Sequence, residues 1–419
     1  MGLKCYPSIL DAPQEVDFAI IAVPAPIVPK VLEDCAKKGV KLATIFSSGF
    51  SETGTREGVL LEKMIAEVAK KVGIRIFGPN CMGAYFPKQG LSFRPDLPKE
   101  SGDIGFISQS GGNAIGIIIC GSVWGLKFSK VFSYGNAADL DSPDLLEYLR
   151  WDKETKVIGL YIEGVKNGSK LLSVLKKTTK EKPVVVWKGG VTELGSRAVA
   201  SHTGALAGSA KIWESALKQA NAVTVHGLEK MIDVLCGFSF LPPSKGKDLG
   251  IVSISGGSSV VCTDVAAQFG FNVPELPRKV QEKIHSVIQP VGVSVKNPID
   301  LASSFFNFDA VEFALREVIN YVDALIFDFQ VHYLTLRESF GEHGIVEKMI
   351  KIVVDAGREY LAAGKPFLTV LPLTFCKNAW LKSKRSFLKA KIPVFTSIIR
   401  AANALSKIYN FYQRKRLCD

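Results

Sequence analysis

The sequence predicts an α/β protein built from three open, mostly parallel sheets, and three observations lead to this class. Short, continuous apolar runs alternate with amphipathic stretches along the chain, as buried parallel strands alternate with helices. Small-residue turns rich in glycine and serine follow several of the apolar runs. The length of 419 residues, of which 47 % are hydrophobic, suits about three domains of about 150 residues each.

The first block of alternating elements ends near residue 97. Its predicted strands are Phe18–Val23, Val40–Ile45 and Ile74–Phe77, and its predicted helices are Pro29–Lys38 and Glu57–Val72. Each strand is a short apolar run of the kind that a sheet buries on both faces. The third strand leads into the turn Gly78–Cys81, where a glycine and a proline explain the segment without a catalytic role for Cys81.

Two further blocks follow the same pattern. The predicted strands of the second are Asp103–Ser108, Lys130–Ser133, Val157–Ile162 and Pro183–Trp187, and those of the third are Leu249–Ser255, Ala324–Phe329, Pro366–Leu371 and Ile392–Phe395. The proline-containing stretch Leu241–Lys247 is the predicted linker. We therefore expect domains at residues 1–97, 98–244 and 248–419.

One strand-turn-helix device occurs twice, as Ile107–Gly112 and as Ile254–Ser259. In both places an apolar strand is followed by serines and glycines that open a helix. The repetition indicates that the second and third domains are related, flavodoxin-like units with open parallel sheets.

Composition narrows the function classes. The net charge of +12 is compatible with a polyanionic substrate. The basic clusters at 382–385 and 413–416 lack interleaved aromatic residues, which favours a solvated surface over nucleic-acid binding. The apolar stretch Ile115–Leu126 is too short and too interrupted by glycine to span a membrane.

The chain is expected in the reducing cytoplasm. Its first residues contain no apolar core of a signal peptide. The eight cysteines are scattered and form no C-x-x-C pair, so their spacing fits neither a zinc site nor a disulfide framework. The histidines outside residue 202 also lack metal-ligand spacing, and no metal site is predicted; they are His226, His285, His332 and His343.

His202 is the candidate nucleophile. It lies in a predicted short loop, Ser201–Gly208, between two hydroxyl residues and ahead of a run of small residues in which Gly204 and Gly208 are the candidate hinge. A neutral imidazole can attack a phosphorus centre near neutral pH, and small residues let a backbone close around an anion or move. The alternative is a histidine in a surface turn, which this segment alone does not exclude.

The segment Ser108–Asn113 is a candidate phosphate cradle. It follows a predicted strand and opens an apolar helix, and the N-terminus of a helix presents unpaired N–H groups and partial positive charge. The residues expected to bind phosphate are Ser108, Ser110, Gly111 and Gly112. No Gly-Lys-Ser/Thr ending is present, so this is not a P-loop, and an ordinary strand-to-helix turn is the alternative.

Glu163 is the candidate partner of the histidine. It comes directly after a buried strand, at the sheet edge where ligands of such folds bind. A carboxylate bonded to an imidazole fixes its tautomer and stabilises a cationic or phosphorylated ring. Alone, Glu163 equally suits a solvated strand end. Other acidic residues are predicted to have local structural roles. Asp139, Asp141 and Asp144 are expected at the start of a helix, and Asp300 is expected in a turn.

Taken together and in order, these motifs resemble the α subunit of NDP-forming acyl-CoA synthetases, especially archaeal ADP-forming acetyl-CoA synthetase, in the succinyl-CoA synthetase superfamily. The resemblance covers nearly the whole chain. The matching stretches are Ala22–Pro26, Phe46–Gly49, Gly78–Cys81, Ser108–Gly112, Ser133–Asp141, Ile162–Gly164, Ser201–Gly208 and Asn297–Asp300.

The resemblance implies a reaction: acyl-CoA, ADP and phosphate give an acid, ATP and CoA through an acyl phosphate and a phosphohistidine. His202 would carry the phosphoryl group, Glu163 would hold its ring, and the Ser108–Gly112 turn would stabilise the phosphohistidine. CoA would lie along residues of the first domain, namely Val23, Pro24, Ser47, Ser48 and Asn80.

The resemblance also implies partners. No ATP-grasp segment is recognisable, so ATP or ADP and Mg²⁺ would bind to a separate ATP-grasp β subunit, in a heterotetramer of two α and two β subunits. The first domain would be Rossmann-like and bind CoA. It lacks about fifty residues of the family pattern, the length of a βαβ unit and a further strand, so we expect an incomplete sheet there. The stretch after Ile326 offers no second anion site.

Two other readings remain. One is a non-catalytic, CoA-binding regulatory scaffold of the same fold, in which the histidine is often lost; an intact His202 favours the enzyme. The other is an NAD-dependent dehydrogenase, which requires G-x-G-x-x-G after the first strand and an acidic residue about twenty positions on. Neither feature is present. None of the motifs identifies the acid or the direction of the reaction.

Overall fold

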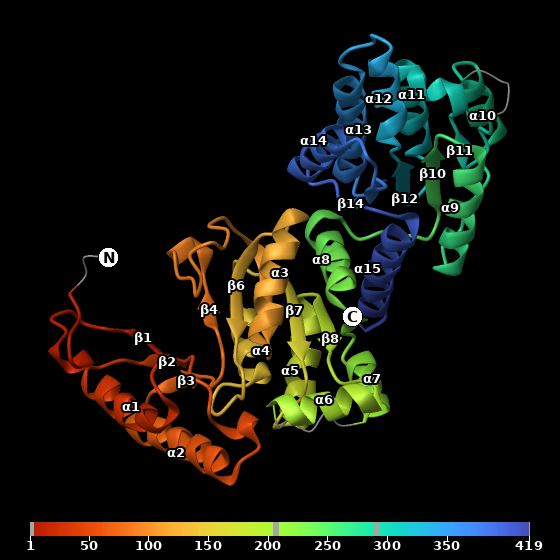
Figure 1. Cartoon of the computed structure of the whole chain (residues 1–419). Helices are drawn as coiled ribbons and strands as arrows, with labels where there is room; N and C mark the ends of the chain where they lie inside the picture. The colour runs from red at the N-terminus through yellow and green to blue at the C-terminus, as the bar shows by residue number, and fades with distance from the viewer. Residues whose placement is uncertain (1–3, 204–208, 289–292, 419) are drawn as a thin grey trace. The chain divides into compact units, whose positions relative to one another are not determined.

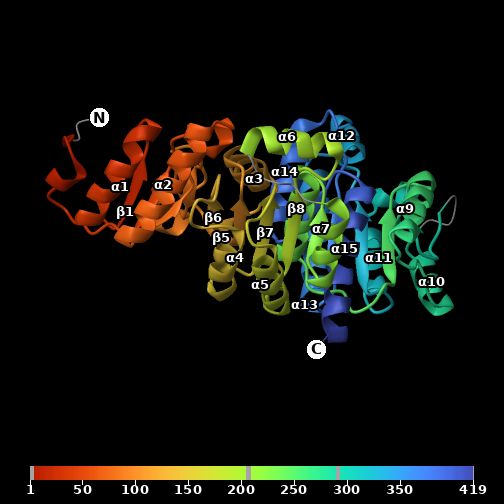
Figure 2. The same ribbon diagram turned by 90° about the horizontal axis from the view of Figure 1, so that it is seen from below.

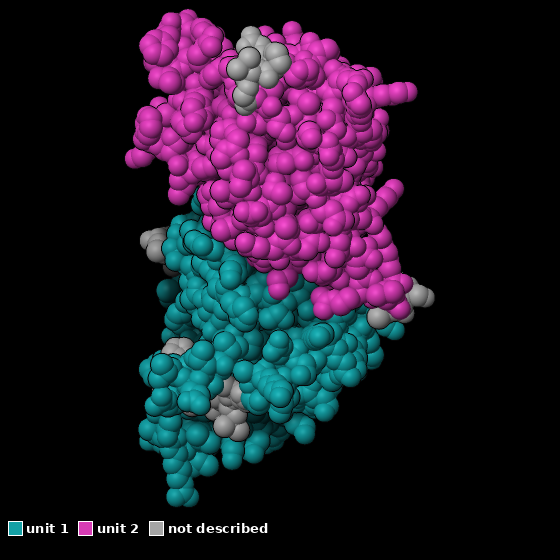
Figure 3. All heavy atoms as spheres, turned by 90° about the vertical axis from the view of Figure 1, so that its right-hand side faces the viewer, with its two compact units in different colours: residues 1–231 teal, residues 232–419 magenta. Residues whose placement is uncertain are grey.

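The computed structural model describes residues 4–203, 209–288 and 293–418, with the exception of the side chains of residues 200–203 and 418. The chain forms two compact units, residues 1–231 and 232–419, which Figure 3 colours separately. In the described residues the first unit contains two sheets and the second contains one. The domain boundaries predicted at residues 97 and 244–248 remain a prediction.

The first sheet of unit 1 is small and parallel. Its strands are β1 (Phe18–Ile21), β2 (Leu42–Ile45) and β3 (Arg75–Phe77), in the order β1-β2-β3, and the connecting helices are α1 (Val28–Lys37) and α2 (Arg56–Val72). Thr55 starts α2, because its hydroxyl accepts the N–H of Gly58 at 3.1 Å. Gly73 ends the helix with a φ of 77°, a conformation that glycine adopts at low cost.

The second sheet of unit 1 has six strands. They are β4 (Gly83–Tyr85), β5 (Ser101–Ser108), β6 (Phe128–Ser133), β7 (Val157–Ile162), β8 (Val184–Lys188) and β9 (Val223–Val225), in the order β4-β6-β5-β7-β8-β9. Counted from β5, the parallel strands follow the flavodoxin-like order 2-1-3-4-5. β4 adds an antiparallel edge strand.

Further helices of unit 1 surround this sheet (Figures 1 and 2). They are α3 (Gly111–Val123), α4 (Ser142–Trp151), α5 (Gly168–Glu181), α6 (Glu193–Thr203) and α7 (Ala210–Gln219), and α8 (Leu228–Phe240) runs past the boundary of the unit at residue 231. Leucines and valines of α4, α5 and α7 share one core with the strands. Asp141 is the N-cap of α4 and forms a capping box with Asp144, which confirms the predicted helix start.

Unit 2 repeats the five-stranded order. Its strands are β10 (Leu249–Ser253), β11 (Ile299–Asp300), β12 (Ala324–Asp328), β13 (Phe367–Val370) and β14 (Val394–Phe395), in the order β11-β10-β12-β13-β14 and all parallel. Its helices are α9 (Gly256–Gln268), α10 (Arg278–His285), α11 (Phe308–Val318), α12 (Val331–Ser339), α13 (Ile345–Ala362), α14 (Lys377–Lys389) and α15 (Ile398–Cys418). Arg400 of α15 binds buried Asp233 through two nitrogens, at 2.7 and 2.8 Å.

Short 3-10 helices complete the list: η1 (Ile9–Asp11), η2 (Ala25–Ile27), η3 (Ser51–Thr53), η4 (Pro87–Gln89) and η5 (Ala302–Phe306). The predicted α/β class, with a mostly parallel sheet in each of three parts and two flavodoxin-like strand orders, is confirmed. One assignment differs: β4 precedes residue 97 yet belongs to the second sheet, because it pairs with β6. No helix in the described residues is long and apolar enough to cross a membrane.

Candidate functional site

The predicted phosphate cradle is a strand-to-helix turn at the carboxyl edge of the six-stranded sheet. Ser108 ends β5, is fully buried, and donates from its hydroxyl to the carbonyl of Ser110 at 2.6 Å. Ser110 is the N-cap of α3, where its hydroxyl accepts the N–H of Asn113 at 3.3 Å. The first turn of a helix carries N–H groups without intrahelical acceptors, so the turn can bind an anion.

The two glycines of this turn have different reasons to be small. A Cβ on Gly111 would lie 2.8 Å from Cγ of Met82, so close packing excludes a side chain there. A Cβ on Gly112 would meet nothing nearer than 3.8 Å, the distance to the hydroxyl of Ser110. Gly112 therefore leaves the space beside the first turn of α3 open. Gly111, in contrast, lets the turn pack closely against the side chain of Met82.

Glu163 directly follows β7 and is 6 % exposed. The side-chain oxygen of Gln109 accepts the backbone N–H groups of Glu163, at 2.8 Å, and Gly164, at 3.0 Å. The hydroxyl of Tyr161 donates to Oε1 of Glu163 at 2.9 Å. The turn after β5 and the end of β7 are thus joined by the side chain of Gln109.

Lys188 ends β8 and is 4 % exposed. Its ammonium donates to the carbonyl of Glu163 at 2.7 Å and also to the carbonyl of Gly189. Burial lowers the pKa of Lys188 to about 8, although the nearby charge of Glu163 opposes that shift. Sequence reasoning did not assign a role to Lys188; a lysine at the end of an apolar strand was the available signal.

His202 lies in the last turn of α6, so the backbone of 201–203 is helical where the sequence predicted a loop. The side chain of His202 and residues 204–208 are outside the described part. The proposed pairing of His202 with Glu163 and the hinge role of the following glycines therefore stay predictions.

The predicted CoA residues occupy the carboxyl ends of the three-stranded sheet. The hydroxyl of Ser47 donates to the carbonyl of Val23, and the N–H of Asn80 donates to the carbonyl of Ser47 at 2.9 Å. Pro24 directly precedes η2, and Ser48 is exposed. The structure thus brings the loops after β1, β2 and β3 together, and small polar groups at the end of a parallel sheet suit a phosphate-bearing cofactor.

A cluster that sequence reasoning missed joins the two sheets of unit 1. Nδ2 of Asn136 donates to Oε2 of Glu52 at 2.6 Å and to Oε2 of Glu62 at 2.9 Å, and Oδ1 of Asn136 lies 3.4 Å from Nδ2 of Asn80. Burial opposes ionisation of Glu52, but hydrogen bonds from Asn136 and from three backbone amides hold its pKa below the ordinary value. The residues are too far apart in sequence to form a motif.

The second strand-turn-helix device, in unit 2, carries carboxylates of its own. Ser255 caps α9 by accepting the N–H of Ser258 at 3.2 Å. Asp328 ends β12, is 3 % exposed, and accepts from the amide of Gln330 at 2.7 Å, and the side chain of Ser258 lies near it. Asp300, at the end of β11, lies next to Gly256. Burial raises the pKa of both carboxyl groups.

The remaining sequence candidates are structural. Cys81 is buried, and burial raises its pKa to about 12, which disfavours the reactive thiolate. Among the described residues, no three side chains of His, Cys, Asp or Glu gather in a way that could hold a metal ion.

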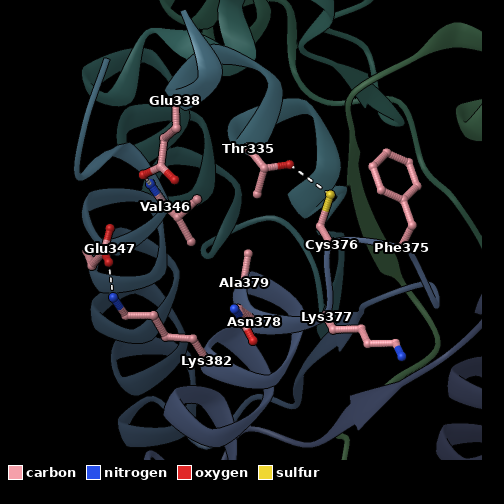
Figure 4. A pocket seen from close by; sticks show the side chains of 10 residues that line it. All are labelled: Thr335, Glu338, Val346, Glu347, Phe375, Cys376, Lys377, Asn378, Ala379 and Lys382. Atoms are coloured by element: carbon pink, nitrogen blue, oxygen red, sulfur yellow. Dashed lines mark hydrogen bonds and ion pairs between the residues drawn. The ribbon is translucent and has the colours of Figure 1, made fainter. Parts of the chain in front are cut away.

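Two cavities lie away from this site. One, of about 820 Å³, is in unit 1 at the amino ends of β1, β2 and β3, opposite to the predicted CoA residues. The other, of about 610 Å³, is in unit 2 between α12, α13 and the start of α14 (Figure 4). There Lys382 pairs with Glu347, and the hydroxyl of Thr335 faces Sγ of Cys376 at 3.0 Å. These four side chains therefore contact one another in two pairs.

Comparison with known proteins adds two domain matches. Residues 1–87 match the CoA binding domain, and residues 101–238 match the succinyl-CoA ligase like flavodoxin domain. The chain is 36 % identical over 426 residues to acetate–CoA ligase [ADP-forming] I subunit alpha of Pyrococcus furiosus, covering 98 % of this chain and 86 % of the relative.

Two more proteins support the same relationship. Acetate–CoA ligase [ADP-forming] II of Archaeoglobus fulgidus is 36 % identical over 435 residues, covering 99 % of this chain, but the chain spans only 60 % of that protein's length. A solved structure of dinucleotide-forming acetyl-coenzyme A synthetase 1 from Candidatus Korarchaeum cryptofilum, in complex with phosphate and ADP, matches with a TM-score of 0.84 and 32 % identity. The match covers 99 % of this chain and 87 % of the chain in that solved structure.

Proposed function

The chain belongs to the family of ADP-forming acetate–CoA ligases, and we propose that it is the α subunit of such an enzyme, an acid–thiol ligase that converts acyl-CoA, ADP and phosphate into an acid, ATP and CoA. The observation that carries the proposal is the hydrogen-bonded link between the start of α3 and the end of β7 in unit 1. Gln109, directly before the N-cap of α3, accepts the backbone N–H groups of Glu163 and Gly164.

The proposed reaction has three balanced steps. A phosphate oxygen attacks the thioester carbonyl, and CoA leaves as its thiolate, which gives an acyl phosphate. The imidazole of His202 then attacks phosphorus, the P–O bond to the acyl group breaks, and the acid leaves as a carboxylate. Finally an oxygen of ADP attacks the phosphohistidine, which yields ATP and restores the imidazole.

The residues of unit 1 would divide this work. The N–H groups at the start of α3, with Ser108, Ser110, Gly111 and Gly112, would neutralise charge on the phosphoryl group. Glu163 would accept the N–H of the imidazole and so favour the tautomer whose free nitrogen attacks. Its burial and its three fixed contacts support this role, since a carboxylate that is already oriented loses little entropy on pairing.

CoA is the cofactor that the first domain match implies. Val23, Pro24, Ser47, Ser48 and Asn80 would hold it at the carboxyl ends of β1, β2 and β3. These positions fit a nucleotide-like group because they combine an exposed hydroxyl with hydrogen-bonded loops that approach one another closely.

A partner is part of the proposal. Two relatives from Pyrococcus furiosus are named as subunits alpha, and the chain spans 56–60 % of the single-chain relatives from Archaeoglobus fulgidus and Methanocaldococcus jannaschii. We infer that an ATP-grasp β subunit binds ATP or ADP and Mg²⁺, in a heterotetramer of two α and two β subunits. Cytoplasmic location is proposed because the cysteines given for the described part are free thiols.

The test is a phosphorylation assay with the full chain, a cognate nucleotide-binding chain, ATP and Mg²⁺. Acid-labile phosphate should map to His202 by mass spectrometry. His202→Ala should abolish labelling and ATP formation, a loss of about 1,000-fold or more, while His226→Ala, an exposed histidine of the same unit, should retain both. Normal ATP formation by His202→Ala would refute the proposed mechanism, and an unlabelled but folded wild-type chain would favour a regulatory scaffold.

A further inference from the structure

Tyr161 lies beside both parts of the proposed phosphoryl site. It is the fifth residue of β7, is 8 % exposed, and donates from its hydroxyl to Oε1 of Glu163 at 2.9 Å. The side chain of Asn113, in the first turn of α3, lies near the same hydroxyl. Tyr161 therefore bonds to the carboxylate close to the start of α3.

The direction of this bond is fixed by chemistry. A carboxylate only accepts, so Tyr161 must give its single proton to Glu163. A hydrogen bond to an ionised acceptor is shorter and stronger than one between neutral groups, so this contact is suited to hold the carboxylate.

The surroundings keep the hydroxyl in place. The ring of Trp187 packs edge-on against Tyr161, with ring centres 4.8 Å apart and an angle of 72°. A Cβ on Gly189 would lie 2.7 Å from the tyrosine oxygen, so only glycine leaves room for the hydroxyl there. Burial raises the pKa of Tyr161 well above its ordinary range, and the charge of Glu163 adds to the effect, so the hydroxyl keeps its proton.

Three neighbours hold different groups of Glu163. Gln109 holds its N–H, Lys188 holds its carbonyl, and Tyr161 bonds to its carboxylate. Gln109 and Lys188 fix where the backbone lies. The bond from Tyr161 acts on the carboxylate itself and so on how that group is turned, which is the property that pairing with an imidazole requires.

We propose that Tyr161 is a positioning residue for Glu163, whose hydroxyl orients the carboxylate relative to the first turn of α3. The proposal rests on the proposed function, in which Glu163 orients His202. It extends that function, because it assigns the orientation of the carboxylate to a residue outside the pair of Glu163 and His202.

A double-mutant cycle separates this role from a merely structural one. With the full chain and its nucleotide-binding partner, Tyr161→Phe should slow phosphorylation of His202 by about 10- to 100-fold, the usual effect of removing an orienting hydrogen bond. In a Glu163→Ala background the same substitution should change the remaining rate by less than about twofold, because no carboxylate is left to orient. Tyr85→Phe, which removes another buried hydroxyl that donates to Pro98, should leave the rate unchanged.

Two results would overturn the proposal: an unchanged rate in Tyr161→Phe, or an equal loss in both backgrounds. If the wild-type chain is not phosphorylated at all, the proposed function fails, and hydrogen exchange on the chain alone decides the inference. Amides of 162–164 should then exchange faster in Tyr161→Phe than in Tyr85→Phe. Equal exchange in the two variants would show that Tyr161 does not hold Glu163.

Discussion

The turn before α3 in unit 1 and the turn before α9 in unit 2 are the same device in different surroundings. Each follows the first strand of a 2-1-3-4-5 sheet, and each starts a helix with a serine cap, Ser110 or Ser255. In unit 1 the neighbouring carboxylate, Glu163, bonds to Tyr161. In unit 2 the carboxylate of Asp328 bonds to Gln330 and lies near Ser258, inside the first turn of the helix.

The difference leads us to propose that a helix N-terminus binds a ligand only when the chain does not fill it. The partial positive charge of α9 already faces buried carboxyl groups of unit 2, Asp300 and Asp328. On this proposal, the turn before α3 is the one that binds an external anion. Matched substitutions in the two turns test this contrast.

Removing charge should separate the two turns most strongly. Glu163→Gln should slow phosphorylation of His202 by about 100-fold, because the amide has the size of the carboxylate but cannot stabilise a cationic ring. Asp328→Asn should change the rate by less than about threefold. Rapid-quench measurements with labelled ATP would check both. Equal losses would mean that both turns handle the phosphoryl group.

Removing the helix caps should have an intermediate effect. Ser110→Ala and Ser255→Ala should each cost about 1 kcal/mol of stability, since each leaves one amide of the first turn without its acceptor. Only Ser110→Ala should also raise the KM for phosphate, by up to about tenfold. Urea unfolding gives the first quantity and steady-state kinetics the second. A raised KM in Ser255→Ala alone would reverse the assignment of the two turns.

The carboxyl groups of unit 2 predict a pH effect with a definite sign. Burial raises the pKa of Asp300, so the folded state binds its proton more tightly than the unfolded state. Stability should therefore fall as pH rises above about 4, the ordinary value, and Asp300→Asn should remove that part of the slope. Hydrogen exchange of unit 2 peptides across this range measures it, with exposed Asp309→Asn as the control. A slope unchanged by Asp300→Asn would rule the group out.

Adding a methyl group should have the smallest effect. Gly112→Ala and Gly257→Ala should each stabilise the chain by about 0.5–1 kcal/mol, because both positions are helical and neither new Cβ would meet an atom nearer than 3.8 Å. Gly111→Ala should instead destabilise it by pushing against Met82. Thermal unfolding checks all three, and a stable Gly111→Ala would show that Met82 moves at little cost.

Much of the fold was predictable because buried parallel strands have continuous apolar sequences. The predicted strand Val157–Ile162 agrees with β7 at both ends, and Leu42–Ile45 lies within its predicted range. The strands that were missed, β4, β9 and β11, have two or three residues each, too few to show a pattern. The antiparallel pairing of β4 depends on a partner about fifty residues away and has no local signal.

The site was predictable as a place but not as a set of contacts. Ligands of such sheets bind where the strands end, which is why Glu163 could be placed at that edge from the sequence. Which side chains cross between strand ends depends on rotamers and packing, so the sequence did not reveal the bonds from Tyr161 or Lys188 to Glu163. The position of the His202 side chain and the roles of the CoA residues remain predictions.

The side-chain amide of Asn136 makes this position sensitive to a substitution that changes charge but hardly changes shape. Its two N–H bonds satisfy the carboxylates of Glu52 and Glu62. Replacing that NH₂ group by oxygen, as in Asn136→Asp, keeps the shape but gathers three negative charges with no proton between them. In a saturation-mutagenesis screen, aspartate should therefore rank below alanine at this position. Selection at position 136 would then act on the charge of the side chain and not on its size.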